Sequence, residues 1–395
     1  MESPARALRY LTAGDPLLGS QRILHRANAR YLGALGWAED SLGLGEALWA
    51  RLRSLPSADA CFVLRSGGVR SLIDRLCEEA SGDRVEPSAE SAAEHAALEA
   101  VLDELQDAKD AKGTLDGAAS GFDRRTPLTA PYPFVTAAWS GSSIDSPWDE
   151  SRQVESRFQE IMATSVGAEP CALRPLGELE AHRIEEALLL LEAVDPLLPH
   201  EIAIHVRHAC WIDYARWPTM DDGEYREVGQ SVSSHEVPSS TFFSGYVLAS
   251  LPLLAESLYH EALHKKLSNT IVAEGLLRDG YDTKTSRRFH SYWNRDFAWN
   301  SSWWELDRAL YAYHVYVHLY VYYSLLSRPG AIERAAPDGG LAPAFVQQRR
   351  EETRERALAL RDWLYDNSAD SMTPTGVRFL HVLGDWMSTG VATPR

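Results

Sequence analysis

Three features of the sequence predict a mainly α-helical protein with a minor β component. Most apolar residues recur at the three- and four-residue spacing of amphipathic helices, whereas strand-like alternation is confined to short segments. Hydrophobic residues make up 45 % of the 395 residues, which is enough for a large core. One long internal stretch is rich in glycine, proline and hydroxyl residues, and it separates two groups of helices.

The first group of helices precedes that stretch. Apolar residues at helical spacing predict helices at Ser41–Leu52, Val69–Glu79 and Ala89–Ala108. Residues 113–146 hold the glycines and prolines and predict a long connection. We therefore predict a domain boundary near residue 125, between a helical N-terminal region (1–125) and a larger domain (126–395). The alternative is a long loop within a single domain.

The second part of the chain combines short strands with long helices. A helix is predicted at Leu176–Ala193, before the helix-ending pair Asp195-Pro196. Short strands are predicted, from alternating or β-branched residues, at Glu201–Trp211, Val228–Val232 and Gly245–Leu248. Further helices are predicted at Leu251–Ser268, Glu305–Leu326, Arg350–Asn367 and Thr375–Met387. The helix at Glu305–Leu326 is apolar nearly all round, so we expect it to be buried.

Charge and composition argue against several classes of protein. The chain carries 39 Lys+Arg and 56 Asp+Glu, a formal net charge of −17, whereas binding to nucleic acid needs a clustered basic surface. No segment has the roughly 20 consecutive apolar residues of a membrane span. No secretion signal and no CxxC pair is visible, so we expect a reducing, cytoplasmic setting. Nucleotide-binding glycine motifs and the GxSxG motif of serine hydrolases are also absent from the sequence.

The strongest functional signal is the motif His260-Glu261-Ala262-Leu263-His264, which matches the metal-binding pattern HExxH. Because it lies within a predicted helix, both imidazoles leave the same face one turn apart and can reach one metal ion. Glu261 lies about 100° further round the helix, where it can act as a base or orient a ligand or bound water. The alternative interpretation is a pair of solvated histidines without a metal.

A protein metal site needs at least a third ligand. Leu267 and Thr270 stand where the long zincin pattern has Gly and His, so that pattern is excluded. Glu305 is one candidate ligand on a following helix. His314 and His318 are again four residues apart, within a segment rich in tyrosine. Of these two histidines we favour His314 as the third ligand.

The sequence around the motif resembles the core of the HExxH-motif peptide-modification proteins. The resemblance rests on Ser244–Leu248 and Leu254–Leu267 and extends over roughly residues 228–325. That family occurs in bacteria with pathways that make ribosomal peptide natural products. Its characterised members are 2-oxoglutarate-dependent enzymes that β-hydroxylate residues of precursor peptides. The resemblance implies a mononuclear non-haem Fe(II) site held by three histidines, 2-oxoglutarate as co-substrate and a precursor peptide as partner.

Two segments depart from the family pattern. The family has Pro-Trp-Arg after the motif, whereas this chain has Tyr292-Trp293-Asn294, which moves the arginine to Arg295. Trp303-Trp304 stands where a second family arginine is expected. Arg295 is the predicted anchor for the far carboxylate of 2-oxoglutarate, because arginine can bind a carboxylate through two hydrogen bonds. Other candidates for this role are Arg288 and Arg308.

Three functions follow from these residues. An Fe(II) ion held by three histidines leaves open positions for a keto acid and O₂, as in a peptide hydroxylase. The same ligands on Zn²⁺ activate water with Glu261 as general base, as in a metallopeptidase or another hydrolase. The third function is peptide binding by a catalytically degenerate member of the family. Residues 1–125 are candidates for recognition of the peptide.

Overall fold

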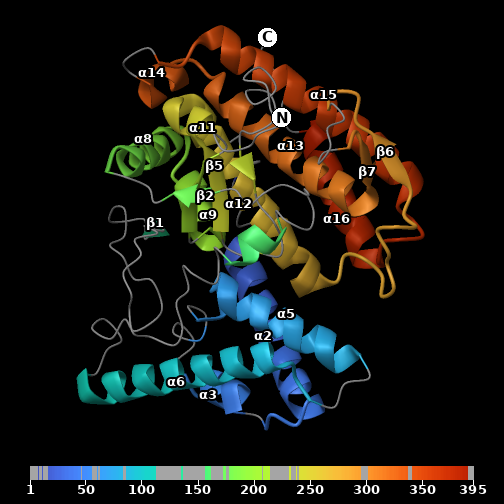
Figure 1. Cartoon of the computed structure of the whole chain (residues 1–395). Helices are drawn as coiled ribbons and strands as arrows, with labels where there is room; N and C mark the ends of the chain where they lie inside the picture. The colour runs from blue at the N-terminus through green and yellow to red at the C-terminus, as the bar shows by residue number, and fades with distance from the viewer. Residues whose placement is uncertain are drawn as a thin grey trace.

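The computed structural model of the chain confirms a mainly α-helical protein with a minor β component (Figure 1). It describes residues 8, 11, 17–45, 47–55, 60, 63–82, 86–112, 135–136, 156–161, 172–174, 178–206, 208–213, 231–232, 237, 240–294, 301–336 and 340–389. In this part of the chain, no helix is long and apolar enough to cross a bilayer.

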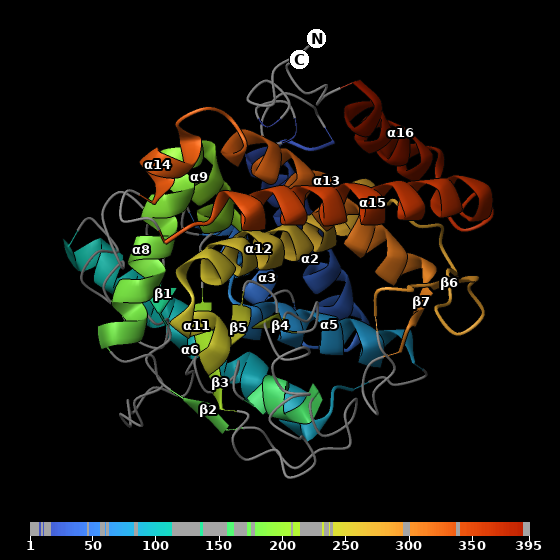
Figure 2. The same cartoon turned by 90° about the horizontal axis from the view of Figure 1, so that it is seen from above.

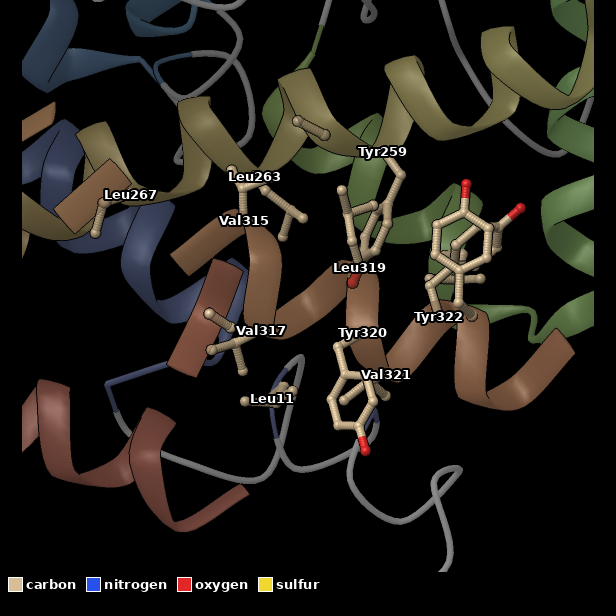
Figure 3. Packing of buried hydrophobic residues seen from close by; sticks show 14 of the residues in the cluster. Leu11, Tyr259, Leu263, Leu267, Val315, Val317, Leu319, Tyr320, Val321 and Tyr322 are labelled. Carbon is tan, nitrogen blue, oxygen red and sulfur yellow. The ribbon is translucent and has the colours of Figure 1, made fainter. Parts of the chain in front are cut away.

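Two long helices form the centre of the larger core. Helix α12 (Leu251–Glu274) contains the HExxH motif, and α13 (Leu306–Leu326) contains the tyrosine-rich segment. Their apolar side chains pack together, as Figure 3 shows for Tyr259 and Leu263 of α12 and Leu319 of α13. Pro252 lies in the first turn of α12, and Gly275 ends the helix in a left-handed conformation with φ 60°.

Other helices cover these two on several sides. Helix α15 (Pro343–Asn367) packs along α13, and α16 (Pro374–Thr389) contacts both of them. Helices α8 (Glu178–Val194) and α9 (Leu197–His205) contact α12, and the short α14 (Ala331–Ala335) contacts α8. Seen from above, α12 lies between α13 and α15 on one side and α2 (Ser20–Ser41) on the other (Figure 2). The motif helix is therefore enclosed along most of its length.

The β component consists of two small sheets in the described part. In the first, β3 (His208–Asp213) runs parallel to β5 (Ser240–Ser244), and β5 pairs antiparallel with β4 (Ser231–Val232). The short strands β1 (Val135–Thr136) and β2 (Ala172–Arg174) pair with successive parts of β3. A separate antiparallel pair joins β6 (Arg288–His290) and β7 (Trp303–Glu305). Strand β4 brings Ser231 to the HExxH motif.

One predicted strand, Gly245–Leu248, is wrong, and another, Glu201–Trp211, is wrong in its first half and confirmed in its second, where β3 begins at His208. The first half of Glu201–Trp211 belongs to helix α9, which starts directly after α8, and between the two helices the Asp195 carboxylate accepts a hydrogen bond from the Leu197 N–H at 3.0 Å. Residues Gly245–Ala249 form the short helix α11, not a strand, because the Ser244 hydroxyl caps its N-terminus by accepting from the Val247 N–H at 3.3 Å. The strand next to α11 is β5, immediately before it.

A smaller apolar core lies in the N-terminal part. Helices α2, α3 (Ala47–Ser54), α5 (Gly67–Ser81) and α6 (Ala89–Lys112) surround it. The predicted helix Ser41–Leu52 is wrong in its bounds, because Gly43 and Gly45 adopt positive φ angles between α2 and α3.

The two cores are linked by α2. Ile23 and Ala27 of α2 pack against Ala273 of α12, and Leu8 and Leu11 belong to the larger core. The predicted boundary near residue 125 lies outside the described residues.

Candidate metal centre

His260 and His264 point at the same place on the surface of α12. Their Nε2 atoms lie 2.9 Å apart, and their ring centroids are 4.7 Å apart. A histidine nitrogen binds Zn²⁺ at about 2.0–2.1 Å, so two such ligands of one ion have nitrogens about 3.0–3.4 Å apart. The observed separation is close to that range. Both side chains are partly exposed on a helix whose other residues near the motif are mostly buried. The pair therefore fits two ligands of a metal ion that is reached from one side.

The Glu261 side chain lies beside this pair and is held by another element. Its residue is only 2 % exposed, and its Oε1 atom lies 4.0 Å from His260 Nε2. The Ser231 hydroxyl of strand β4 donates a hydrogen bond to this same oxygen at 2.6 Å. A hydrogen bond to a carboxylate oxygen fixes the direction of the side chain. The carboxylate is thus positioned next to the histidines.

The surroundings of His264 keep its imidazole neutral. Burial and the neighbouring His260 lower the pKa of His264 to about 3. The Tyr311 ring of α13 lies 5.7 Å from the His264 ring, between centroids. The Tyr311 hydroxyl is 2.9 Å from the Ser268 Oγ, one turn further along α12. A neutral imidazole has a lone pair available for a metal ion at ordinary pH.

The third ligand predicted for this centre does not join the pair. Among the described residues, no group of three or more His, Cys, Asp or Glu side chains is arranged to hold a metal ion. His314 is fully buried, with its ring 4.3 Å from that of His318 and 5.8 Å from that of Phe379. It is Tyr311, one turn earlier on α13, that faces His264.

His314 and His318 have core environments. Burial lowers the pKa of His314 well below its usual value and that of His318 to about 3. The Nδ1 of His318 donates a hydrogen bond to the His314 carbonyl oxygen at 2.8 Å. Neither ring nitrogen of His314 has a hydrogen-bond partner among the described residues. Both imidazoles are therefore neutral groups within the apolar core.

The predicted anchor Arg295 lies outside the described residues. Of the other candidates, Arg288 is half exposed and lies 3.4 Å from the Glu305 carboxylate. Arg308 of α13 stacks over the Trp304 ring at 5.0 Å. Its positive charge contributes to the lowered pKa of His264, so it lies near the histidine pair. Of Arg288 and Arg308, only Arg308 is among the charges that lower the pKa of His264.

A cavity of about 750 Å³ lies between the N-terminal helices and the part of α12 that follows the motif, and neither His260 nor His264 lines it. Tyr31 of α2 and Arg70 of α5 line one side, and Lys265 and Ser268 of α12 line the other, with Tyr311 of α13. Ser268 and Tyr311 thus border the cavity and also lie against His264. Its volume is within the range of about 300–1,000 Å³ that is typical of small-molecule sites.

Two buried cations belong to the wall of this cavity. The Arg70 guanidinium donates to the Leu64 carbonyl, to Asn28 Oδ1 and to Asn269 Oδ1 at 2.7, 2.9 and 2.7 Å. The Lys265 ammonium donates to the Val237 carbonyl at 2.7 Å. Burial lowers the pKa of Lys265 to about 7. The nearby charge of Glu261 raises this pKa, whereas the charge of Arg70 lowers it.

Several residues of this region were not singled out in the sequence. Ser268 continues the row of His260 and His264 at four-residue spacing, so the helical period would have found it. Ser231 and Arg70 carry no such signal, because they reach the motif helix from distant parts of the chain.

A comparison with protein-family models and with curated proteins finds no match for this chain.

Proposed function

We propose that the protein is a non-haem Fe(II) enzyme that uses 2-oxoglutarate to β-hydroxylate residues of a ribosomally made precursor peptide. The observation that carries this proposal is the 2.9 Å approach of His260 Nε2 and His264 Nε2 on the partly exposed side of α12. The resemblance to the HExxH-motif peptide-modification proteins favours iron and hydroxylation over other metal chemistry. The cavity lined by Lys265 and Ser268, further along α12, is large enough for part of a peptide.

Each residue of the candidate metal centre has a defined role in this proposal. His260 and His264 would supply two of the at least three ligands that the metal ion needs, both as neutral imidazoles. Glu261, oriented by Ser231, would accept a hydrogen bond from a ligand or water at the metal. Arg308 would take the anchoring role predicted for Arg295, since it is a cation close to His264. When bound, Fe(II) supplies the redox chemistry that activates O₂, which no protein side chain can provide.

A zinc hydrolase is the second candidate. Its supporting observation is the position of Glu261, whose Oε1 atom lies 4.0 Å from His260 Nε2. In that reaction Glu261 would remove a proton from the water, and Ser231 would hold the base in place. The two candidate functions therefore assign different roles to the Glu261 carboxylate.

An anaerobic titration tests the first proposal. Fe(II) and then 2-oxoglutarate are added to the full-length protein, and the visible metal-to-ligand charge-transfer band is recorded. We expect a band that requires both additions, is absent in His264→Ala and persists in the matched control His182→Ala, whose side chain is 64 % exposed on α8. Binding of Fe(II) without any response to 2-oxoglutarate would contradict the use of this co-substrate.

Glu261→Gln separates the two chemistries. The amide keeps the shape of the side chain but cannot take up a proton. A hydrolase should lose nearly all turnover of a peptide in the presence of Zn²⁺, because its base is gone. A hydroxylase should keep bound metal and part of its activity. A protein that binds peptide but shows neither activity would be a binding-only member.

A further inference from the structure

The Tyr311 side chain joins α13 to the histidine row of α12. Its ring packs against the His264 ring, with 5.7 Å between the centroids and 39° between the planes. Its hydroxyl lies 2.9 Å from Ser268 Oγ, one turn further along α12. One tyrosine thus contacts the proposed metal ligand with its ring and the next residue of the same row with its hydroxyl.

The hydrogen bonds around Ser268 determine which group donates. The Ser268 hydroxyl donates to the His264 carbonyl oxygen at 3.1 Å. A serine hydroxyl has a single proton, so both contacts of Ser268 are satisfied only when the Tyr311 hydroxyl donates to the Ser268 oxygen. Two hydrogen bonds in series therefore lead from Tyr311 through Ser268 to the backbone of His264. Because that backbone belongs to a helix, the phenol is fixed relative to the residue that carries the imidazole.

The backbone of Tyr311 is also fixed. Its neighbour Leu310 is fully buried, and α13 packs against both α12 and α15. A side chain that is held at its backbone by packing and at its tip by a hydrogen bond has little rotamer freedom. A neighbour of a metal ligand needs this property in order to orient the ligand.

The orientation of the His264 ring decides whether the two histidines can share an ion. In the observed orientation its Nε2 lies 2.9 Å from His260 Nε2. A half-turn of the ring about its bond to Cβ would put the carbon Cε1 where Nε2 now lies, and carbon cannot bind a metal ion. The contact with His260 alone does not prevent that rotation, so a further neighbour has to hold the ring.

We propose that Tyr311 is a positioning residue that holds the His264 imidazole with its Nε2 towards His260. The inference rests on the metal centre of the proposed function, and it applies to Fe(II) and Zn²⁺ alike. The Tyr311 ring makes the contact with the imidazole, and the hydrogen bond to Ser268 keeps that ring in place.

Titration of the full-length, metal-free protein with Co²⁺ tests this role, with the visible absorption of the bound ion as the readout. Tyr311→Leu should weaken Co²⁺ binding by roughly tenfold or more, the usual effect of removing a group that orients a metal ligand. Tyr311→Phe keeps the ring and should retain most of the affinity. Tyr316→Leu is the matched control, because Tyr316 is partly exposed on the same helix and packs against the Trp293 ring, and it should bind Co²⁺ normally. Unchanged affinity in Tyr311→Leu would overturn the proposal.

A double-mutant cycle tests the hydrogen bond between the two hydroxyl groups. Tyr311→Phe removes its donor and Ser268→Ala removes its acceptor, so each variant should reduce the Co²⁺ affinity by a similar small factor. The double variant should lose no more than either single variant, because the interaction is already absent from both. Losses that multiply in the double variant would show that the hydroxyl groups act independently, and they would overturn the proposed role of this hydrogen bond.

Chemical modification of the metal-free protein gives a readout that needs no metal ion. Diethyl pyrocarbonate acylates accessible neutral imidazoles, and mass spectrometry identifies the modified residue. In Tyr311→Leu, His264 should react severalfold faster relative to the exposed His182, because its ring has lost its neighbour. His314 and His318 are fully buried and should stay unmodified, which shows that the core remains closed. An unchanged rate at His264 would mean that Tyr311 does not hold its ring.

The two readouts separate failure of this inference from failure of the proposed function. If the unaltered protein binds no Co²⁺, the proposed metal centre is wrong, whereas the modification rate at His264 still tests the role of Tyr311. If the unaltered protein binds Co²⁺ and both readouts are the same in Tyr311→Leu, the metal centre stands and the role of Tyr311 is wrong.

Discussion

The Ser231 hydroxyl donates a hydrogen bond of 2.6 Å to Oε1 of Glu261 and thereby joins strand β4 to the HExxH motif. Groups that orient the residues around a metal ion usually affect metal affinity or activity about 10–100-fold when they are removed. The contact therefore makes Ser231 a positioning residue for the carboxylate.

Ser231→Ala should weaken metal binding by roughly tenfold or more, because Glu261 then loses its fixed orientation beside His260. Titration with Co²⁺, followed by its visible absorption, measures the affinity. Ser231→Thr keeps a hydroxyl group and should restore most of the lost metal affinity. Such a recovery shows that the hydroxyl group itself is needed, and not only a folded protein. Ser54→Ala, at an exposed position on α3, serves as the control. Unchanged affinity in Ser231→Ala would show that the contact has no role in the metal site.

His314→Phe should keep its metal ion, whereas His264→Phe should lose it. His314 lies against His318 and Phe379 in the core, and its ring nitrogens have no hydrogen-bond partner in the described residues. An apolar ring removes these buried polar atoms, so the free energy of unfolding should stay the same or increase. Metal content after gel filtration and urea unfolding measure the two effects. Loss of the metal in His314→Phe would restore His314 as the third ligand.

The buried histidines should make the protein sensitive to acid. The folded-state pKa of His318 is about 3, below its usual value of 6.5, so the unfolded chain binds more protons between these two pH values. The free energy of unfolding therefore decreases as the pH falls from about 6.5 towards 3, by at most about 1.4 kcal/mol per pH unit for this group.

His318→Leu should reduce this slope, because the side chain no longer takes up a proton on unfolding. Urea unfolding at several pH values within the window measures the slope. His182→Gln, on the exposed side of α8, should leave it unchanged. An equal slope in His318→Leu and the unaltered protein would mean that His318 is not neutral in the folded state.

The ion pair of Lys266 and Glu201 should be required for folding stability. The Lys266 Nζ lies 2.5 Å from the Glu201 Oε1, with side chains 0 % and 2 % exposed, and Ser20 donates to the same oxygen at 2.5 Å. Glu201→Ala leaves a buried ammonium without its carboxylate and should lower the free energy of unfolding by about 3–5 kcal/mol.

Two further variants test whether the loss of stability in Glu201→Ala comes from the unpaired charge. The double variant Glu201→Leu/Lys266→Met should recover much of the loss, because it removes both charges at once. Asp362→Ala, with a side chain 66 % exposed, should change the stability by less than about 0.5 kcal/mol. Full loss in the double variant would show that packing at these positions matters more than charge.

The sequence predicts the central helices well, because their signal is local. The apolar period of α12 and α13 extends over many turns, and the HExxH spacing itself places His260 and His264 together. The short helix α11 has five residues and a serine cap, and a pattern of that length does not distinguish a helix from a strand. The third ligand was predicted from the same four-residue spacing on α13, but that spacing does not determine which residue of α13 faces α12.

The enclosed position of α12 has a consequence for hydrogen exchange. Its backbone amides around Tyr259–Leu267 lie within the larger core, so they should become accessible to deuterium only when that core opens. The proposed ligands would then stand on one of the most slowly exchanging segments of the chain, although their imidazoles reach solvent. A metal ion would be able to enter and leave this site without any unfolding of the helix that carries it.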